Sequence, residues 1–209
     1  MATLVLVRHG HTDTAGRRLS GWTPGVHLNA RGREQAERLV QRLDGVRIDS
    51  IVSSPLERCR ETAVPLAKAR RLAVRIRRAW IEVGYGDWTG RSISQLRRTK
   101  LWRTVTHAPS NVRFPGGESL LEVQARAVEA ALDLARQHPR GTVVVVSHAD
   151  VIRLLVAHVA GTHPDHLQRW SVDAGSISAV SFSDGTPRLL AVNDTGDLAF
   201  LRTRRGLGG

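Results

Sequence analysis

The amino-acid sequence predicts an α/β fold, a three-layer α/β/α sandwich around a mostly parallel central sheet. Short apolar runs rich in β-branched residues alternate along the chain with longer amphipathic segments. The 209 residues are 41% hydrophobic, which is enough to bury one sizeable core, and no linker or internal repeat divides them. We therefore expect a single domain over residues 1–201 and a disordered tail over residues 202–209.

The first predicted strand and helix have clear boundaries. Thr3–Val7 is a continuous apolar run, typical of a strand that is buried on both faces. Asn29 is a favourable N-cap for the segment that follows, and Gly45 is a favourable stop. The apolar residues in between repeat with helical spacing, so we expect them to form one buried face. That face contains Ala36, Leu39, Val40 and Leu43.

The next segments predict a strand, a helix and a strand. Asp49–Ser54 is the second apolar run. Ser54 and Pro55 have the residue types of an N-cap and a first helical position, which predicts a helix that runs to about Ala69. The third strand is predicted over Leu72–Ile76.

The second half begins with a region that we expect to be rich in loops. Residues 80–117 contain several glycines and prolines, which disfavour long regular elements. A long helix is predicted over Glu118–Gln137, a strand over Gly141–His148 and a helix over Ala149–Ala160. Apolar residues of the long helix recur at steps of four and three, which predicts a core-facing stripe. The stripe consists of Leu121, Ala125, Val128, Leu132 and Ala135.

The last two strands are predicted to form a hairpin. The runs ISAVSF at 177–182 and RLLAV at 188–192 flank the turn-forming sequence SDGTP. Because helices separate the earlier strands, we expect these to be mostly parallel and covered by helices on both faces.

The charge of the chain is strongly positive. Thirty-one basic residues, of which only two are lysines, face 19 acidic ones, for a formal net charge of +12. Such a surface can attract nucleic acid, an anionic membrane or anionic substrates. The arginines are scattered along predicted helices and aromatic residues make up only 4% of the chain, so we favour a codon bias towards solvated arginines. We expect no nucleic-acid and no membrane partner.

Cysteine content and hydropathy indicate a cytoplasmic protein. The only cysteine, Cys59, excludes an internal disulfide and fits a small core residue. The start of the chain lacks a basic segment before its short apolar run, so we expect no signal peptide. No apolar run approaches the roughly 20 residues that a membrane helix needs.

Basic side chains follow three of the predicted strands. Arg8 and His9 follow the first strand, Arg58 lies just after the second, and His148 ends the strand of residues 141–148. If these strands are parallel neighbours, the four side chains meet at one edge of the sheet, where open α/β sheets bind ligands. Arginine forks and helix N-termini both bind phosphate oxygens. The pattern therefore predicts a phosphate pocket, although each residue taken alone is more often structural.

A second cluster of polar residues is a candidate metal site. The segment HVAGTHPDH contains four side chains that could bind a metal: His158, His163, Asp165 and His166. Thr162 as a cap and Pro164 as a first position also make it an ordinary helix start. We favour the helix start and expect no metal and no cofactor.

Six segments in order resemble the phosphoglycerate-mutase-like branch of the histidine phosphatase superfamily. LVRHGHT is similar to the family's Arg-His-Gly-x-Thr signature, and SSPLERCRETA to its Ser-Ser-x-Leu-x-Arg-x-x-x-Thr-Ala. LNARGREQA, IEVGYGDWTG, PGGES and VVVVSHADVIR resemble four further motifs of the family. The resemblance covers most of the chain and implies the phosphoglycerate-mutase-like fold.

The resemblance implies a phosphomonoesterase that acts through a phosphohistidine, without a metal. His9 would be the nucleophile, and Glu82 would protonate the leaving oxygen and then activate water. Arg8, Arg58 and His148 would bind the phosphoryl oxygens. The residues that would line the substrate pocket are Arg8, Thr12, Ser20, Gly21, Arg58, Tyr85, His148 and Ala149.

Departures from the family pattern favour a phosphatase over a mutase. Position 11 is His11 instead of the usual Glu or Gln, and Ala15 replaces the asparagine of phosphoglycerate mutases. Their basic insertion is also missing, although four basic residues remain in the compact region: Arg97, Arg98, Lys100 and Arg103. The alternatives are a phosphoglycerate-type mutase and a non-catalytic phosphate- or phosphoprotein-binding module. A small phosphomonoester is the expected partner, and a homodimer is the default assembly.

Overall fold

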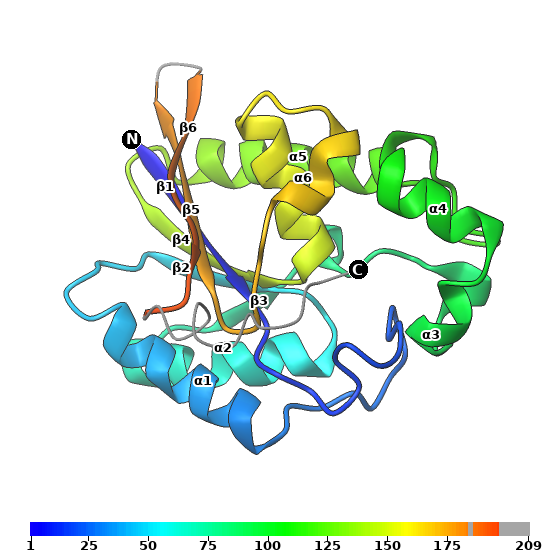
Figure 1. Cartoon of the computed structure of the whole chain (residues 1–209). Helices are drawn as coiled ribbons and strands as arrows, with labels where there is room; N and C mark the ends of the chain where they lie inside the picture. Colours follow the sequence, from blue (N-terminus) through cyan, green and yellow to red (C-terminus); the bar gives the residue numbers. More distant parts are fainter. Residues whose placement is uncertain (184–185, 197–209) are drawn as a thin grey trace.

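The computed structural model describes residues 1–183 and 186–196, which form one six-stranded sheet between layers of helices (Figure 1). The strand order is β3-β2-β4-β1-β5-β6, in which the first four strands are parallel and the last two antiparallel. This confirms the predicted α/β class and the mostly parallel sheet. The strands are β1 (Ala2–Arg8), β2 (Ser50–Ser53), β3 (Val74–Ile76), β4 (Thr142–Ser147), β5 (Ile177–Ser183) and β6 (Thr186–Asp194).

Helices cover both faces of the sheet. In the described part of the chain the α-helices are α1 (Ala30–Arg42), α2 (Glu57–Arg70), α3 (Ile93–Leu96), α4 (Lys100–His107), α5 (Leu120–Gln137) and α6 (Ala149–Val159). Short 3-10 helices cover Arg78–Trp80, Gly86–Trp88, Pro109–Asn111 and Pro164–Arg169. Successive residues of a strand point to opposite faces, so β4 contributes to two cores. Val144 and Val146 pack with α1 and α2, whereas Val143 and Val145 pack with α5 and α6.

The predicted start of α1 is confirmed, and that of α2 is wrong. Asn29 caps α1 by accepting a hydrogen bond from the backbone N–H of Gly32. The N-cap of α2 is Leu56, which provides no side-chain hydrogen bond, so Ser54 does not begin this helix. The backbone of Ser54 instead donates to Val146 of β4, and its hydroxyl lies in the site described below.

The predicted core stripe of α5 is also wrong, apart from Val128, which is partly buried against the core. Leu121 and Leu132 are 45% and 41% exposed. The helix begins in a capping box between Ser119 and Glu122, and it turns a second apolar row towards the sheet. That buried row is Leu120, Val123, Ala127, Ala131 and Leu134. Both rows have helical spacing, so periodicity alone does not distinguish them.

The region expected to be rich in loops contains two short helices. Ser92 caps α3 and Thr99 caps α4, each by accepting a backbone N–H three residues ahead. The indole of Trp102 in α4 stacks on that of Trp88, which attaches this helix to the core. In Figure 1, α3 and α4 lie at one end of the molecule.

The end of the chain is described in part. β5 and β6 pair from Ile177 to Asp194, as the predicted hairpin requires, but its turn residues 184–185 and the predicted tail at 202–209 lie outside the described residues. After α6, the short helix is capped by His163 and not by Thr162. Within the described part of the chain, no helix is long and apolar enough to cross a membrane. Residues 1–183 and 186–196 contain no group of three or more metal-binding side chains.

Candidate active site

The candidate site lies at the carboxyl ends of β1, β4 and β2, which are adjacent in the sheet. His9 directly follows β1 and donates its backbone N–H to Ser147 at the end of β4. Ser54 follows β2, and His148 follows β4 and is the N-cap of α6. The prediction that these strand ends meet at one edge is confirmed, because β4 lies between the other two strands.

His9 is buried and has one ring nitrogen engaged. Its Nδ1 lies 2.8 Å from the carbonyl oxygen of Gly10, so Nδ1 carries the hydrogen and donates. This leaves the lone pair of Nε2 available. Burial, followed by the guanidinium groups of Arg58 and Arg8, lowers the pKa of His9 well below 6.5. The imidazole is therefore neutral near pH 7, as a nucleophile requires.

The loop after His9 is held by a close approach to α1. A Cβ atom at Gly32 would lie 2.1 Å from the carbonyl oxygen of His11, so only glycine fits in this turn of the helix. On the other side, the backbone N–H of Gly10 donates to the hydroxyl of Thr62 in α2 at 3.0 Å. These contacts fix the backbone on which the His9 imidazole is carried.

Arg58 and Arg8 each place a buried N–H donor that has no partner among the described residues at the carboxyl ends of these strands. Arg58 is 2% exposed, and its Nη2 donates to the carbonyl of Gly21 at 2.9 Å. Arg8 donates Nη1 to the carbonyl of Val172 at 2.7 Å. Nη1 of Arg58 and Nε of Arg8 are buried and have no hydrogen-bond partner among the described residues. An anion such as phosphate supplies acceptors that suit buried guanidinium donors of this kind.

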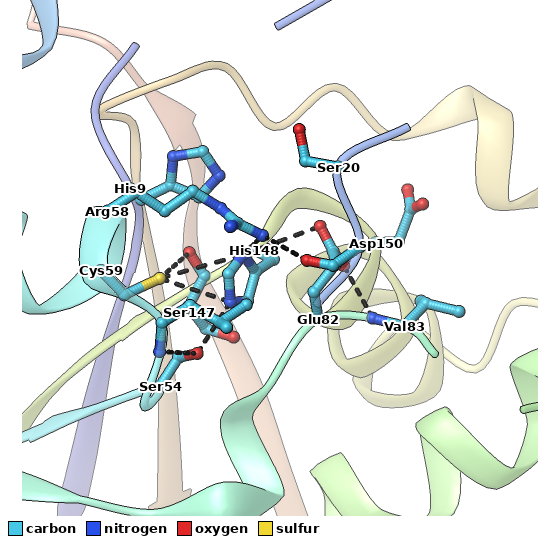
Figure 2. Close-up of polar contacts among 12 residues, drawn as sticks. His9, Ser20, Ser54, Arg58, Cys59, Glu82, Val83, Ser147, His148 and Asp150 are labelled. Carbon is cyan, nitrogen blue, oxygen red and sulfur yellow. Dashed lines mark hydrogen bonds and ion pairs between the residues drawn. The ribbon is translucent and has the colours of Figure 1, made fainter. Parts of the chain in front are cut away.

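His148 is fully buried between Arg58 and Ser54 (Figure 2). Its Nδ1 accepts from Nη2 of Arg58 at 3.3 Å, so Nε2 carries the hydrogen and donates to the Ser54 hydroxyl at 2.8 Å. Burial and the charge of Arg58 lower the pKa of His148 well below 6.5. Its ring centroid lies 5.2 Å from that of His9. The thiol of Cys59 packs against the His148 ring, and burial raises the pKa of this thiol.

Glu82 faces the two histidines from the segment before the second 3-10 helix. Its Oε2 lies 3.7 Å from Nδ1 of His148, and its Oε1 accepts the backbone N–H of Val83 at 3.0 Å. Burial raises the pKa of Glu82 to about 7, with a further contribution from the carboxylate of Asp150, against the opposing charge of Arg58. A carboxyl group with this pKa can both donate and accept a proton near neutral pH.

The other residues that were predicted to line the pocket lie on the segments that carry or contact these side chains. Thr12 and Ser20 are the ends of a hydroxyl chain through Thr14, with oxygen separations of 3.2 and 2.8 Å. Gly21 has φ +48° and directs its carbonyl to Arg58. Tyr85 donates its hydroxyl to Asp150 at 2.8 Å. Ala149 is the first residue of α6.

Several residues of the site were not found from the sequence. Arg126 donates to the carbonyl of Glu82 at 3.1 Å and pairs with Glu118, whose carboxylate accepts the N–H of Gly84 at 2.7 Å. Asp150 and the hydroxyl of Ser54 were missed as well. Glu118 lies inside the segment PGGES, Asp150 inside VVVVSHADVIR and Ser54 inside SSPLERCRETA. Each has a partner that is distant along the chain (Gly84, Tyr85 and His148), and no local pattern indicates such contacts.

Comparison with known proteins finds similar sequences and structures over most of the chain. The family model of the histidine phosphatase superfamily (branch 1) matches residues 4–195. Phosphoserine phosphatase 1 of Hydrogenobacter thermophilus is 31% identical over 93% of either chain. The adenosylcobalamin/alpha-ribazole phosphatase of Escherichia coli is 32% identical over 91% of this chain and 95% of its own. The solved structure of Bacillus stearothermophilus YhfR is 30% identical with a TM-score of 0.87, covering 93% of this chain and 98% of that one.

Proposed function

Because the chain belongs to branch 1 of the histidine phosphatase superfamily, we propose that it hydrolyses a small phosphomonoester by transferring the phosphoryl group to Nε2 of His9. The chain is a phosphoric monoester hydrolase, and the assignment of its residues is our proposal. The observation that carries this assignment is the hydrogen bond from Nδ1 of His9 to Gly10, which leaves Nε2 free in a neutral, buried ring.

In the first step the lone pair of Nε2 attacks phosphorus and the bond to the leaving oxygen breaks. Glu82 in its acid form gives its proton to that oxygen, so the leaving group departs as an alcohol. We assign Nη1 of Arg58 and Nε of Arg8 to the equatorial phosphoryl oxygens, because both donors are buried without partners among the residues described. A bound dianion also favours protonation of His148, whose Nδ1 can then donate.

In the second step water is consumed and the enzyme is restored. Glu82, now a carboxylate, takes a proton from water while the water oxygen attacks the phosphohistidine. The P–N bond breaks, phosphate forms and the electron pair returns to Nε2 of His9. A pKa of about 7 for Glu82 allows the same carboxyl group to perform both proton transfers.

The names of the relatives support a substrate class. Two of them are phosphoserine phosphatase 1 and an adenosylcobalamin/alpha-ribazole phosphatase, so we propose a small phosphorylated metabolite. With Ala15 at the position of the mutase asparagine, we expect 3-phosphoglycerate to yield either free phosphate or no product, and no 2-phosphoglycerate.

A homodimer remains a prediction. Leu121 and Leu132 are two exposed apolar side chains on one face of α5, and this face is our candidate for the contact between copies. Sedimentation of the full chain, with the charged variant Leu132→Glu as comparison, measures whether such a dimer exists.

The proposal is tested by trapping the covalent intermediate. Wild-type protein quenched in alkali after brief exposure to a ³²P-labelled substrate should carry base-stable, acid-labile phosphate. His9→Ala should lose both this label and turnover while unfolding at a similar denaturant concentration. His107→Ala removes an exposed histidine of α4 and should change neither. Substantial turnover by His9→Ala, or a label that survives acid, would contradict the proposed nucleophile.

A further inference from the structure

Asp150 is a fixed carboxylate at the edge of the site that the proposed reaction does not use. It is the second residue of α6, two positions after His148. Its Oδ2 accepts the Tyr85 hydroxyl at 2.8 Å, and its Oδ1 accepts Nη1 of Arg153 at 3.1 Å. The N-terminal turn of a helix also favours a negative charge. Asp150 is therefore held in one place by hydrogen bonds to both of its carboxylate oxygens.

Asp150 is connected to the segment that carries Glu82 through Tyr85. Tyr85 lies three residues after Glu82 on the same segment, so its hydrogen bond ties that segment to the start of α6. In Figure 2 the Asp150 side chain lies on the same side of the site as Glu82. Glu82 thus has positive and negative neighbours. Charged and titratable groups surround it from every neighbouring element: Arg8 from β1, Arg58 and Cys59 from α2, Arg126 from α5, His148 and Asp150 at the start of α6, and Tyr85 from its own segment.

Phosphoryl binding and protonation of the leaving oxygen require opposite electrostatic environments around Glu82. Binding a phosphoryl group requires the arginines, but nearby guanidinium groups favour the ionised form of Glu82. Protonating a leaving oxygen requires the acid form. Burial alone favours the acid form, and a second carboxylate close by favours it further, because two neighbouring carboxylates resist being charged together.

We propose that Asp150 is a positioning residue for Glu82, which it holds in place through Tyr85 and keeps in the acid form by its own negative charge. The inference rests on the proposed role of Glu82 as the acid. Burial of Glu82 and the nearby carboxylate of Asp150 both raise the pKa of Glu82, so Glu82 holds a proton close to neutral pH. In this way one pocket combines a cationic phosphate site with a neutral acid.

The closest replacement is Asp150→Asn, which keeps the shape and removes the charge. The titration of Glu82 should move to lower pH. Phosphoenzyme formation from an alkyl phosphate, followed by rapid quench, should then fall roughly threefold to tenfold above about pH 7, the loss that a displacement of half to one pH unit produces. An aryl phosphate, whose leaving group needs little protonation, should lose less, and KM should change little.

Glu82 can also be titrated without any turnover. The infrared band of its protonated carboxyl group, identified as the band missing in Glu82→Gln, should disappear at lower pH in Asp150→Asn than in the wild type. Asp87→Asn makes the same change at an exposed carboxylate near Tyr85 and should leave the titration where it was. Asp150→Glu restores the charge and should recover part of the wild-type pH profile.

The outcomes separate this inference from the proposed function. If Asp150→Asn titrates and reacts with the wild-type pH profile, or raises KM alone, Asp150 does not act through Glu82 and the inference is wrong. If Glu82→Gln forms the phosphoenzyme from an alkyl phosphate as fast as the wild type, the proposed acid itself is wrong. The infrared titration still reports the effect of Asp150 in that case.

Discussion

The two imidazoles of the site are fixed through opposite ring nitrogens. His9 uses Nδ1 to donate to a backbone carbonyl, whereas His148 uses Nε2 to donate to the Ser54 hydroxyl. Each ring therefore presents a different unprotonated nitrogen, Nε2 in His9 and Nδ1 in His148. The first is free for attack, and the second faces Arg58 and Glu82. The hydrogen bonds of the two imidazoles therefore give them different roles, His9 as a free nucleophile and His148 as a neighbour of Arg58 and Glu82.

Arg58 provides a residue-scale prediction with a close control. Arg58→Ala removes a buried donor that has no partner in the described part of the chain, so inorganic phosphate or vanadate should bind more weakly. Turnover should fall about 10²- to 10³-fold, the usual cost of losing one donor to the developing charge. Steady-state kinetics and phosphate inhibition measure both effects.

The control is Arg60→Ala, two positions along the same helix, where the side chain is exposed. Its kinetics should match those of the wild type. Equal losses in the two variants would show that Arg58 acts only through the general charge of the chain. Arg42 is unsuitable as a control, because it donates to the carbonyls of Gly175 and Asp194. The expectation that the helix arginines are solvated is wrong for this one.

At the scale of elements, what could be read from the sequence was the placement of strands and the residues that follow them. His9, Arg58 and His148 could be brought together in advance because parallel neighbours end at one edge, whatever their side chains do. The buried face of α5 could not be predicted, because two apolar rows on the helix have the same period and only packing against the sheet selects one of them. Asp150 and Ser54 could not either, since their roles depend on partners more than 60 residues away.

The contact between the first loop and α1 gives an element-scale prediction. In Gly32→Ala the new methyl group would overlap the carbonyl of His11, so the loop that carries His9 must shift. We expect the free energy of unfolding to fall by about 1–3 kcal/mol, as in other overpacked sites, and kcat to fall with it. Denaturant titration and kinetics measure the two losses.

Glu34→Ala places an alanine on the exposed side of the same helix and should leave both quantities near the wild-type values. Full activity in Gly32→Ala would mean that the loop tolerates displacement, and that the close approach of Gly32 to the His11 carbonyl does not position His9.

For the whole molecule, three buried ionisable side chains make stability depend on pH. His9 and His148 have folded pKa values well below 6.5, so the unfolded chain binds more protons and stability falls as the pH drops below about 6.5. The pKa of Glu82 is about 7 in the folded chain and about 4.5 for the unperturbed group, so the folded chain keeps this proton up to a higher pH than the unfolded chain. Its contribution is therefore present at low pH and is lost as the pH rises from about 4.5 to 7.

Glu82→Gln should consequently stabilise the fold while impairing the reaction. At about pH 8 the wild type carries a buried carboxylate that the variant lacks, so the variant should be more stable by about 1–3 kcal/mol. Near pH 5 the wild-type side chain is protonated in the folded state and the difference should become small. Denaturant unfolding at the two pH values measures it, and an equal difference at both would mean that the Glu82 charge does not matter to stability.

The central position of β4 has a consequence for how the enzyme loses its activity. The strand is hydrogen-bonded to β1 and β2 along its length, and its end carries His148 while its neighbours lead to His9 and Ser54. Backbone amides in such a strand exchange with deuterium only when the sheet itself opens. Local fraying at the edges leaves these three loops in place, so inactivation by heat or denaturant should coincide with the slowest amide exchange of β4.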